Sequence, residues 1–337
     1  MVSGKLRSGH SEGITPHCRR SRMRALARYT LLDVVLICLG LSACNADQHL
    51  SARVVDLSRP DATHSIAIWM PPDPNGLTPS ISLDYSSAAS NGLMGVGWNF
   101  SVSRAIERCG RRIGQESKVA PIELSLEDRF CIYDDILRLE AGSSPYGTPN
   151  SQYVSALDDS MRITAHGTQG SGPRFFIIEA RDGLTYEFGR TEDSRVLPGT
   201  SPLIATTALR WMLNKVSDRG GNSFAINYVN QDGFAFPVTV SWTPTSSGSG
   251  TYQNAAVFSY SGDRSESDSY KGQIAGYLVA NRHRLEEIQI KTGSVVRRKY
   301  RFIYDTSASR SRSRLVALLE CLDEAETNCS APISFTY

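Results

Sequence analysis

The sequence contains little histidine and none of the short motifs that mark the common enzyme classes. It lacks a GxSxG nucleophile elbow, an HExxH zinc helix, a GxGxxG turn after a strand and a GxxxxGK[ST] phosphate loop. The histidines after Cys44 are scattered singly, at His49, His64, His166 and His283. A histidine triad or a metal centre therefore has no local signature, and we expect no enzyme, no metal and no cofactor.

A strong charge of one sign is also missing. Lys and Arg total 36 against 34 Asp and Glu, and seven of the basic residues and two of the acidic ones precede residue 44. The remaining 29 basic and 32 acidic residues nearly balance, whereas a nucleic-acid binder needs a concentrated basic face. We therefore expect no nucleic-acid partner. The longest apolar run, residues 31–41, is shorter than the ~20 residues that span a bilayer, which excludes a polytopic membrane protein.

Residues 23–43 have the layout of a secretory signal peptide. Arg24 and Arg28 precede the apolar stretch, and small residues follow it. The ending Leu-Ser-Ala-Cys44 resembles the lipobox of bacterial lipoproteins, which predicts cleavage before Cys44 and a lipid on its sulfur. Asn45 then resembles the signal that directs a lipoprotein to the outer membrane.

The residues up to and including Cys44, here called the leader, also indicate where the reading frame and the mature protein begin. Residues 1–22 are polar and offer nothing that a signal needs, so we interpret them as an over-called start before Met23. Simple secretion after a cut elsewhere is the alternative, because Asp33 interrupts the apolar stretch. Residues 44–63 are expected to be a linker and residues 64–337 one β domain.

Four cysteines remain after the leader, an even number that is typical of disulfides in an exported chain. They are Cys109, Cys131, Cys321 and Cys329, for which the sequence alone leaves three pairings. The last two enclose a short acidic loop and are the easiest pair to close, which would leave Cys109 with Cys131. Zinc is the competing interpretation, but no CxxC and no nearby His accompany these cysteines.

Almost every segment after the leader has the period-two pattern of a strand or is a short β-branched and aromatic run between turn residues. This pattern predicts an all-β fold of mostly antiparallel sheets. Hairpins are expected at Asp182-Gly183 and at residues 218–222, and exposed loops at residues 245–251 and 307–314. Examples of the expected strands are residues 65–70, 81–85, 97–103, 174–180, 185–188, 209–216, 223–229, 237–242, 256–260, 285–291, 295–304 and 333–337.

The segment of residues 79–108 carries the most specific pattern in the chain. A strand ending in Leu-Asp-Tyr85 is followed by a Gly-rich turn, by Gly95-Val-Gly97-Trp98 and by a strand that ends in an arginine. This segment resembles the opening of the SpvB/TcaC-type N-terminal domain. That family comprises the non-catalytic part of the Salmonella virulence protein SpvB, the B components of insecticidal Tc toxins, and related RHS-type shells.

Further matches follow in family order and extend the resemblance over nearly all of residues 64–337. They include Asp128-Arg129-Phe-Cys131, Trp211, Asp218 and Asn222, Tyr300-Arg-Phe-Ile-Tyr304, Cys321 and Cys329. The resemblance implies a β-shell scaffold whose partners are other toxin-complex or RHS-type shell proteins. The family's propeller and effector parts have no counterpart after Tyr337, so we expect a reading frame truncated before them, and the lipobox departs from the Tc components.

Two enzymatic or ligand-binding alternatives remain open. Glu324-Ala-Glu326 resembles the ExE turn of ADP-ribosyltransferases, but no Ser-Thr-Ser strand accompanies it, which favours chance acidity in a turn. A cell-surface carbohydrate-binding module or glycosidase is the second alternative. It depends on exposed aromatic side chains, with Trp69, Trp98, Trp211 and Trp242 as candidates, and on adjacent acidic pairs such as Asp134/Asp135.

Overall fold

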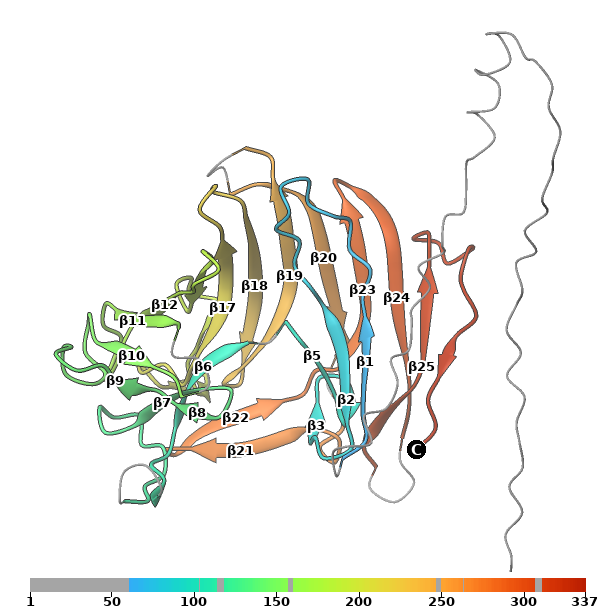
Figure 1. Cartoon of the computed structure of the whole chain (residues 1–337). Helices are drawn as coiled ribbons and strands as arrows, with labels where there is room; N and C mark the ends of the chain where they lie inside the picture. The colour runs from blue at the N-terminus through green and yellow to red at the C-terminus, as the bar shows by residue number, and fades with distance from the viewer. Residues whose placement is uncertain are drawn as a thin grey trace, which may run out of the picture. The chain divides into compact units, whose positions relative to one another are not determined.

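A long antiparallel sheet dominates the protein, as Figure 1 shows for a computed structural model. The structure describes residues 61–102, 104–113, 118–156, 160–246, 250–262, 264–306 and 311–337, all within one compact unit, His49–Tyr337. The leader, the predicted start at Met23, Cys44 and most of the expected linker lie outside these residues. Within the described residues, no helix is long and apolar enough to cross a membrane.

The main sheet follows the order of the chain, and each strand is antiparallel to the next. Its strands are β17 (Arg210–Ser217), β18 (Ser223–Gln231), β19 (Phe234–Pro244), β20 (Tyr252–Tyr260), β23 (Leu285–Thr292), β24 (Val295–Thr306), β25 (Ser313–Cys321) and β26 (Ile333–Ser334). On the other side of β17 the sheet continues through β13 (Thr185–Phe188), β12 (Phe175–Glu179), β11 (Arg162–His166), β10 (Gln152–Val154) and β9 (Arg138–Leu139). The predicted all-β, mostly antiparallel fold is confirmed.

Strand β17 belongs to two sheets at once. Its first residues, Arg210–Met212, pair with β6 (Ala105–Cys109) and β14 (Arg195–Val196), whereas its second half pairs with β13 and β18. Strand β6 then continues to β7 (Arg129–Ile132) and β8 (Asp135–Ile136). This pairing holds β6 beside the start of β17, although about a hundred positions separate the two strands in the sequence.

A second layer lies against the main sheet. It consists of β1 (Thr63–Ala67), β2 (Ser82–Ser86) and β5 (Trp98–Phe100), which Figure 1 shows in front of the main sheet. The ring of Phe100 stacks on Phe258 of β20 with 5.7 Å between centroids, and the Trp242 indole of β19 donates a 2.9 Å hydrogen bond to the carbonyl oxygen of Pro71. Three short hairpins complete the described elements: β3 (Asn91–Gly92) with β4 (Gly95–Val96), β15 (Gly199–Thr200) with β16 (Leu203–Ile204), and β21 (Tyr270–Ile274) with β22 (Tyr277–Asn281).

The alternation of side chains explains why these sequences form half-buried strands. In β23, Leu285, Ile288 and Ile290 are buried in the core between the layers, whereas Glu286 is exposed. The predicted hairpins at Asp182-Gly183 and at residues 218–222 are confirmed, since they join β12 to β13 and β17 to β18. The ends of residues 245–251 are exposed as expected, and Thr245 hydrogen-bonds Thr251 across the loop.

Two sequence-based expectations at the C-terminal end are wrong in part. Ser313 and Arg314 were placed in an exposed loop, but both belong to β25, and Ser313 is buried. Arg314 lies opposite Asp305 in the β24–β25 ladder and binds its carboxylate at 2.9 Å. This pairing stabilises a strand in a segment whose sequence is of low complexity. The strand expected at residues 333–337 is limited to Ile333–Ser334, because the residues after it turn toward Trp98.

Candidate functional site

The Gly-x-Gly-Trp motif forms a tight hairpin that presses against β25. Gly95 has φ +85°, and a Cβ atom at this position would lie 2.5 Å from the carbonyl oxygen of Ser313. Gly97 has φ +82°, and its Cβ would meet the ring of Tyr85 at 2.5 Å. Only glycine combines this backbone conformation with such close contacts, so both glycines serve packing.

Trp98 fills the space beneath this hairpin and joins it to the C-terminal segment. The side chain is 2% exposed, and its Nε1–H donates to the Tyr337 hydroxyl at 2.8 Å. The Tyr337 hydroxyl in turn donates to the carbonyl oxygen of Leu315 at 2.7 Å. The rings of Tyr85 and Phe335 contact the indole at centroid distances of 5.3 and 4.9 Å. The motif is therefore a junction between the front layer and β25.

A buried polar cluster, formed by Arg264, Asp268 and Ser313, supports the same hairpin. The Asp268 carboxylate accepts a 2.7 Å hydrogen bond from the backbone N–H of Ser313 and a second bond from its hydroxyl. Arg264 is ion-paired with Asp268 at 3.7 Å and donates to the carbonyl oxygen of Gly92 at 2.9 Å. The sequence analysis did not predict this cluster, because its members come from separate segments that only the fold brings together.

A second buried centre is organised by Arg108 of β6. Its guanidinium forms a fully buried 2.9 Å ion pair with Asp128 and donates to the carbonyl oxygens of Ser125, Ser171 and Ala208 at 2.6 to 2.8 Å. The other Asp128 oxygen accepts from the backbone N–H of Glu123 at 2.9 Å. Burial lowers the pKa of Arg108, and Asp128 acts in the opposite direction.

The structure brings three predicted motif residues together around this arginine. Trp211 is fully buried with its ring centroid 5.7 Å from the Arg108 guanidinium carbon, and Asp128 is the ion-pair partner. Arg129 lies beside them with its guanidinium carbon 4.6 Å from the Tyr146 ring. A cation between aromatic faces and carbonyl oxygens is well satisfied, so this cluster ties loops together.

The four late cysteines form two disulfides. Cys109 of β6 is bonded to Cys131 of β7 with 5.9 Å between their Cα atoms, beside the Arg108 centre. Cys321 at the end of β25 is bonded to Cys329 and closes the acidic loop. Among the residues that the structure describes, no group of three or more His, Cys, Asp or Glu could hold a metal ion.

Asp218 and Asn222 lie apart from both clusters, in the turn that joins β17 to β18. The Asp218 carboxylate accepts from the backbone N–H of Asn222 at 2.9 Å and from its side-chain amide at 2.8 Å. The side-chain hydrogen bond from Asn222 is the main cause of the lowered pKa of Asp218. This pair fixes the hairpin turn.

The residues that motivated the enzymatic and sugar-binding alternatives have other roles. Trp98, Trp211 and Trp242 are buried and were wrongly considered as exposed aromatics, because they supply the core of the layers. Trp69 is half-buried beneath Arg298, with 4.4 Å from the guanidinium carbon to the ring. Glu326 of the ExE sequence binds Lys299 at 2.9 Å and Arg301 at 2.6 Å, and the Lys299 hydrogen bond is the main cause of its lowered pKa.

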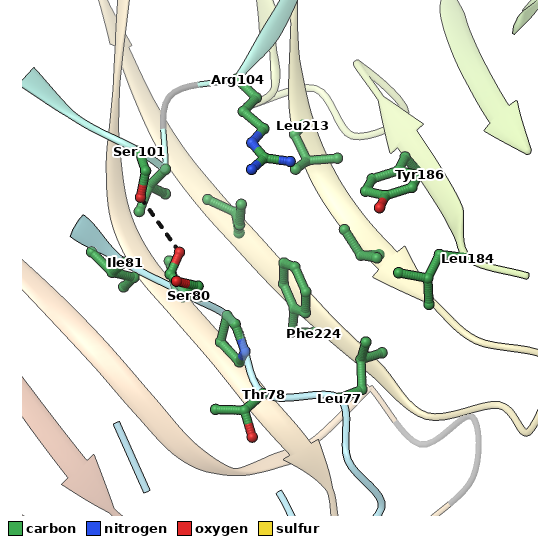
Figure 2. A pocket seen from close by; sticks show the side chains of 15 residues that line it. Leu77, Thr78, Ser80, Ile81, Ser101, Arg104, Leu184, Tyr186, Leu213 and Phe224 are labelled. Carbon is green, nitrogen blue, oxygen red and sulfur yellow. Dashed lines mark hydrogen bonds between the residues drawn. The ribbon is translucent and has the colours of Figure 1, made fainter. Parts of the chain in front are cut away.

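The described residues also enclose an apolar hollow of about 180 Å³ between the two layers, shown in Figure 2. One wall is the segment of residues 77–81 with Ser101 and Val102, and the other consists of Leu184 and side chains from β13, β17, β18 and β19. Arg104 extends over the hollow toward Leu213, with Phe224 at its centre. None of the predicted motif residues lines this hollow.

The fold and the hairpin define a large antiparallel β-sheet domain with a buried Gly-x-Gly-Trp junction. Residues 59–135 match the family described as SpvB, Salmonella virulence plasmid 65kDa B protein. The mono(ADP-ribosyl)transferase SpvB of Salmonella typhimurium is 22% identical over 198 residues, which covers 54% of this chain and 32% of that protein. The chain spans about a third of the length of the curated relatives that it matches.

Solved structures share the fold over most of the chain. The crystal structure of TcdB2-TccC3 gives a TM-score of 0.66 at 18% identity and covers 85% of this chain and 16% of that one. The N-terminal domain of effector protein SpvB from Salmonella typhimurium strain LT2 gives a TM-score of 0.59 at 16% identity, covering 77% of this chain and 99% of that one. Residues 59–135 thus carry the family match to SpvB, and over most of the chain the fold is similar to those of TcdB2-TccC3 and of the SpvB N-terminal domain.

Proposed function

We propose that this protein is a non-catalytic β-scaffold that builds part of a toxin-complex or RHS-type shell and binds another protein of that assembly. The observation that carries this proposal is the likeness to TcdB2-TccC3 over 85% of the chain. The Photorhabdus luminescens Tc holotoxin pore has a similar likeness, with a TM-score of 0.62 at 16% identity over 86% of this chain and 17% of that one. Large interlocked sheets are suited to form part of a shell that binds its partner protein through a broad surface rather than a cleft.

The contacts of the motif residues support a scaffold role. Asp128, Trp98 and Trp211 are buried in packing and ion pairs, where they cannot touch a substrate. The curated relatives are named mono(ADP-ribosyl)transferases, and the part of them that this chain matches is about a third of their length. We propose that the transferase activity does not belong to this part.

Incubation with labelled NAD and cell extract tests the absence of catalysis, with SpvB as the positive control. We expect no protein to be labelled by this chain. Labelling that disappears in a Glu326→Gln variant would show instead that the ExE turn is catalytic.

Isolation of the tagged protein from its own host tests the partner. We expect a protein of toxin-complex or RHS type to co-purify in stoichiometric amount and to elute with the chain as one large species. A lipoprotein with the same signal peptide and an unrelated domain serves as the control. A chain that elutes alone, or a partner that the control also retains, contradicts the scaffold proposal.

We further propose that a lipid on Cys44 anchors the exported protein to the outer membrane. The proposal is supported by the lipobox-like sequence before Cys44 and by Asn45 after it. Thioether lipidation together with acylation gives stable anchoring, because a single chain binds a membrane only marginally. Palmitate labelling should mark the wild type and a Cys38→Ser control but not Cys44→Ser. A labelled Cys44→Ser protein, or an unlabelled wild type, contradicts the anchor.

A further inference from the structure

The hollow between the two layers has an apolar wall that water still reaches. Leu77, Leu184 and Phe224 line it and are only half-buried, whereas most of the aliphatic side chains behind them are fully buried. A ligand that covers these three side chains would remove apolar surface from water, which is favourable by about 25 cal/mol per Å². The wall therefore suits an apolar body.

The Thr78 and Ser101 hydroxyl groups at the hollow already hold its wall. The Thr78 hydroxyl accepts from the backbone N–H of Asp73 at 2.7 Å. The Ser101 hydroxyl accepts from the backbone N–H of Ser82 at 2.9 Å and donates to the carbonyl oxygen of Ser80 at 3.4 Å. This side of the hollow is therefore a fixed surface and not a loop that must reorganise.

The Arg104 guanidinium and the Tyr186 hydroxyl at the hollow are without a partner in the part of the chain that the structure describes. Arg104 lies at the exposed mouth of the hollow, and its guanidinium forms neither an ion pair nor a hydrogen bond with the described residues. The Tyr186 hydroxyl is likewise unbonded, and burial raises the pKa of this group, so it stays a proton donor. Figure 2 shows both side chains at one end of the hollow.

We infer that this hollow binds a small organic acid with an apolar body, whose carboxylate pairs with the Arg104 guanidinium and accepts a hydrogen bond from Tyr186. The volume of about 180 Å³ sets the size. An apolar cavity of about 150 Å³ holds one benzene ring, so the ligand is an aryl-alkanoic or short-chain alkanoic acid. This binding site is independent of the proposed scaffold role.

Calorimetric titration of the folded protein with 3-phenylpropionate tests the inference, and 3-phenylpropan-1-ol is the matched uncharged probe. We expect the acid to bind at least tenfold more tightly than the alcohol. Arg104→Gln should weaken acid binding at least tenfold and leave alcohol binding unchanged, and Tyr186→Phe should weaken it less. Arg312→Gln, which removes an exposed arginine outside the hollow, should have no effect.

A Leu184→Trp variant, which fills the hollow, should abolish the binding of both probes. Equal affinity for acid and alcohol, or an Arg104→Gln variant that binds the acid as the wild type does, would overturn the inference. The absence of any binding to the wild type would overturn it as well. Thermal unfolding of each variant separates loss of the site from loss of the fold.

Discussion

Buried arginine side chains link loops through hydrogen bonds and ion pairs where no β-ladder joins them. Arg108 binds Asp128 and three carbonyl oxygens, and Arg195 donates to the carbonyl oxygens of Gly189 and Arg190. Burial lowers the pKa of both groups. A guanidinium carries five N–H donors in a fixed plane, so one buried side chain can satisfy several loops that meet at one point.

Asp128→Asn is expected to destabilise the protein by about 3 to 5 kcal/mol, because it leaves the buried Arg108 charge without its partner. Urea unfolding measures the change. The matched control is Glu179→Gln, which removes the acid of the exposed 3.7 Å pair with Arg162 and should cost less than about 1 kcal/mol. Equal losses in the two variants would contradict a structural role for the buried pair.

Gly95→Ala and Gly76→Ala separate backbone conformation from close packing. Both glycines have positive φ, but a Cβ at Gly95 would meet β25 at 2.5 Å, whereas nothing lies within 4 Å of a Cβ at Gly76. Gly76→Ala should cost about 1 kcal/mol for the left-handed backbone, and Gly95→Ala clearly more. Melting temperatures of the two variants decide the matter, and similar values would show that the hairpin is not pressed against β25.

At the scale of the strands, the sequence is informative where alternation is long and poor where strands are short. Residues 285–291 and 295–304 alternate charged and apolar side chains and were predicted within a few residues. The strand β25, whose start reads as an Arg/Ser run, was missed. Its strand state depends on pairing with β24, which no local pattern encodes.

The same limit applies to the candidate sites. The Gly-x-Gly-Trp hairpin was recognisable because its glycines and tryptophan are adjacent in the chain. The Arg264–Asp268–Ser313 cluster and the hollow beneath Arg104 were not, because their residues come from distant segments. Burial of Trp98, Trp211 and Trp242 also depends on the stacking of layers, which is why they were considered for sugar binding.

The two disulfides tie neighbouring elements together, and their removal should lower stability by different amounts. Their cysteines are 22 and 8 positions apart. Chain entropy predicts a loss of about 3 kcal/mol for Cys109→Ala with Cys131→Ala, and about 2.5 kcal/mol for the other pair. Melting with and without reductant measures the effect. Free thiols in the untreated protein, or zinc released on unfolding, would contradict the bridges.

For the whole molecule, the contacts between layers predict one cooperative unit. Phe100 of β5 stacks on Phe258 of β20 with 5.7 Å between centroids, and the Trp69 backbone N–H donates to the Tyr300 hydroxyl at 3.1 Å. Hydrogen exchange with mass spectrometry at rising urea should therefore show β2 and β19 opening at the same denaturant concentration. Loss of protection in β2 well before β19 would show that the front layer is an independent unit.

The bond between Trp98 and Tyr337 also determines the order in which the protein can fold. The two residues are 239 positions apart, so the hairpin made early in synthesis has no cover until residues 335–337 have emerged. Such distant contacts slow folding and leave apolar strands uncovered in the meantime. The nascent chain therefore holds the hairpin without its Tyr337 contact until residues 335–337 have been made, and the hairpin can reach its final packing only from that point on.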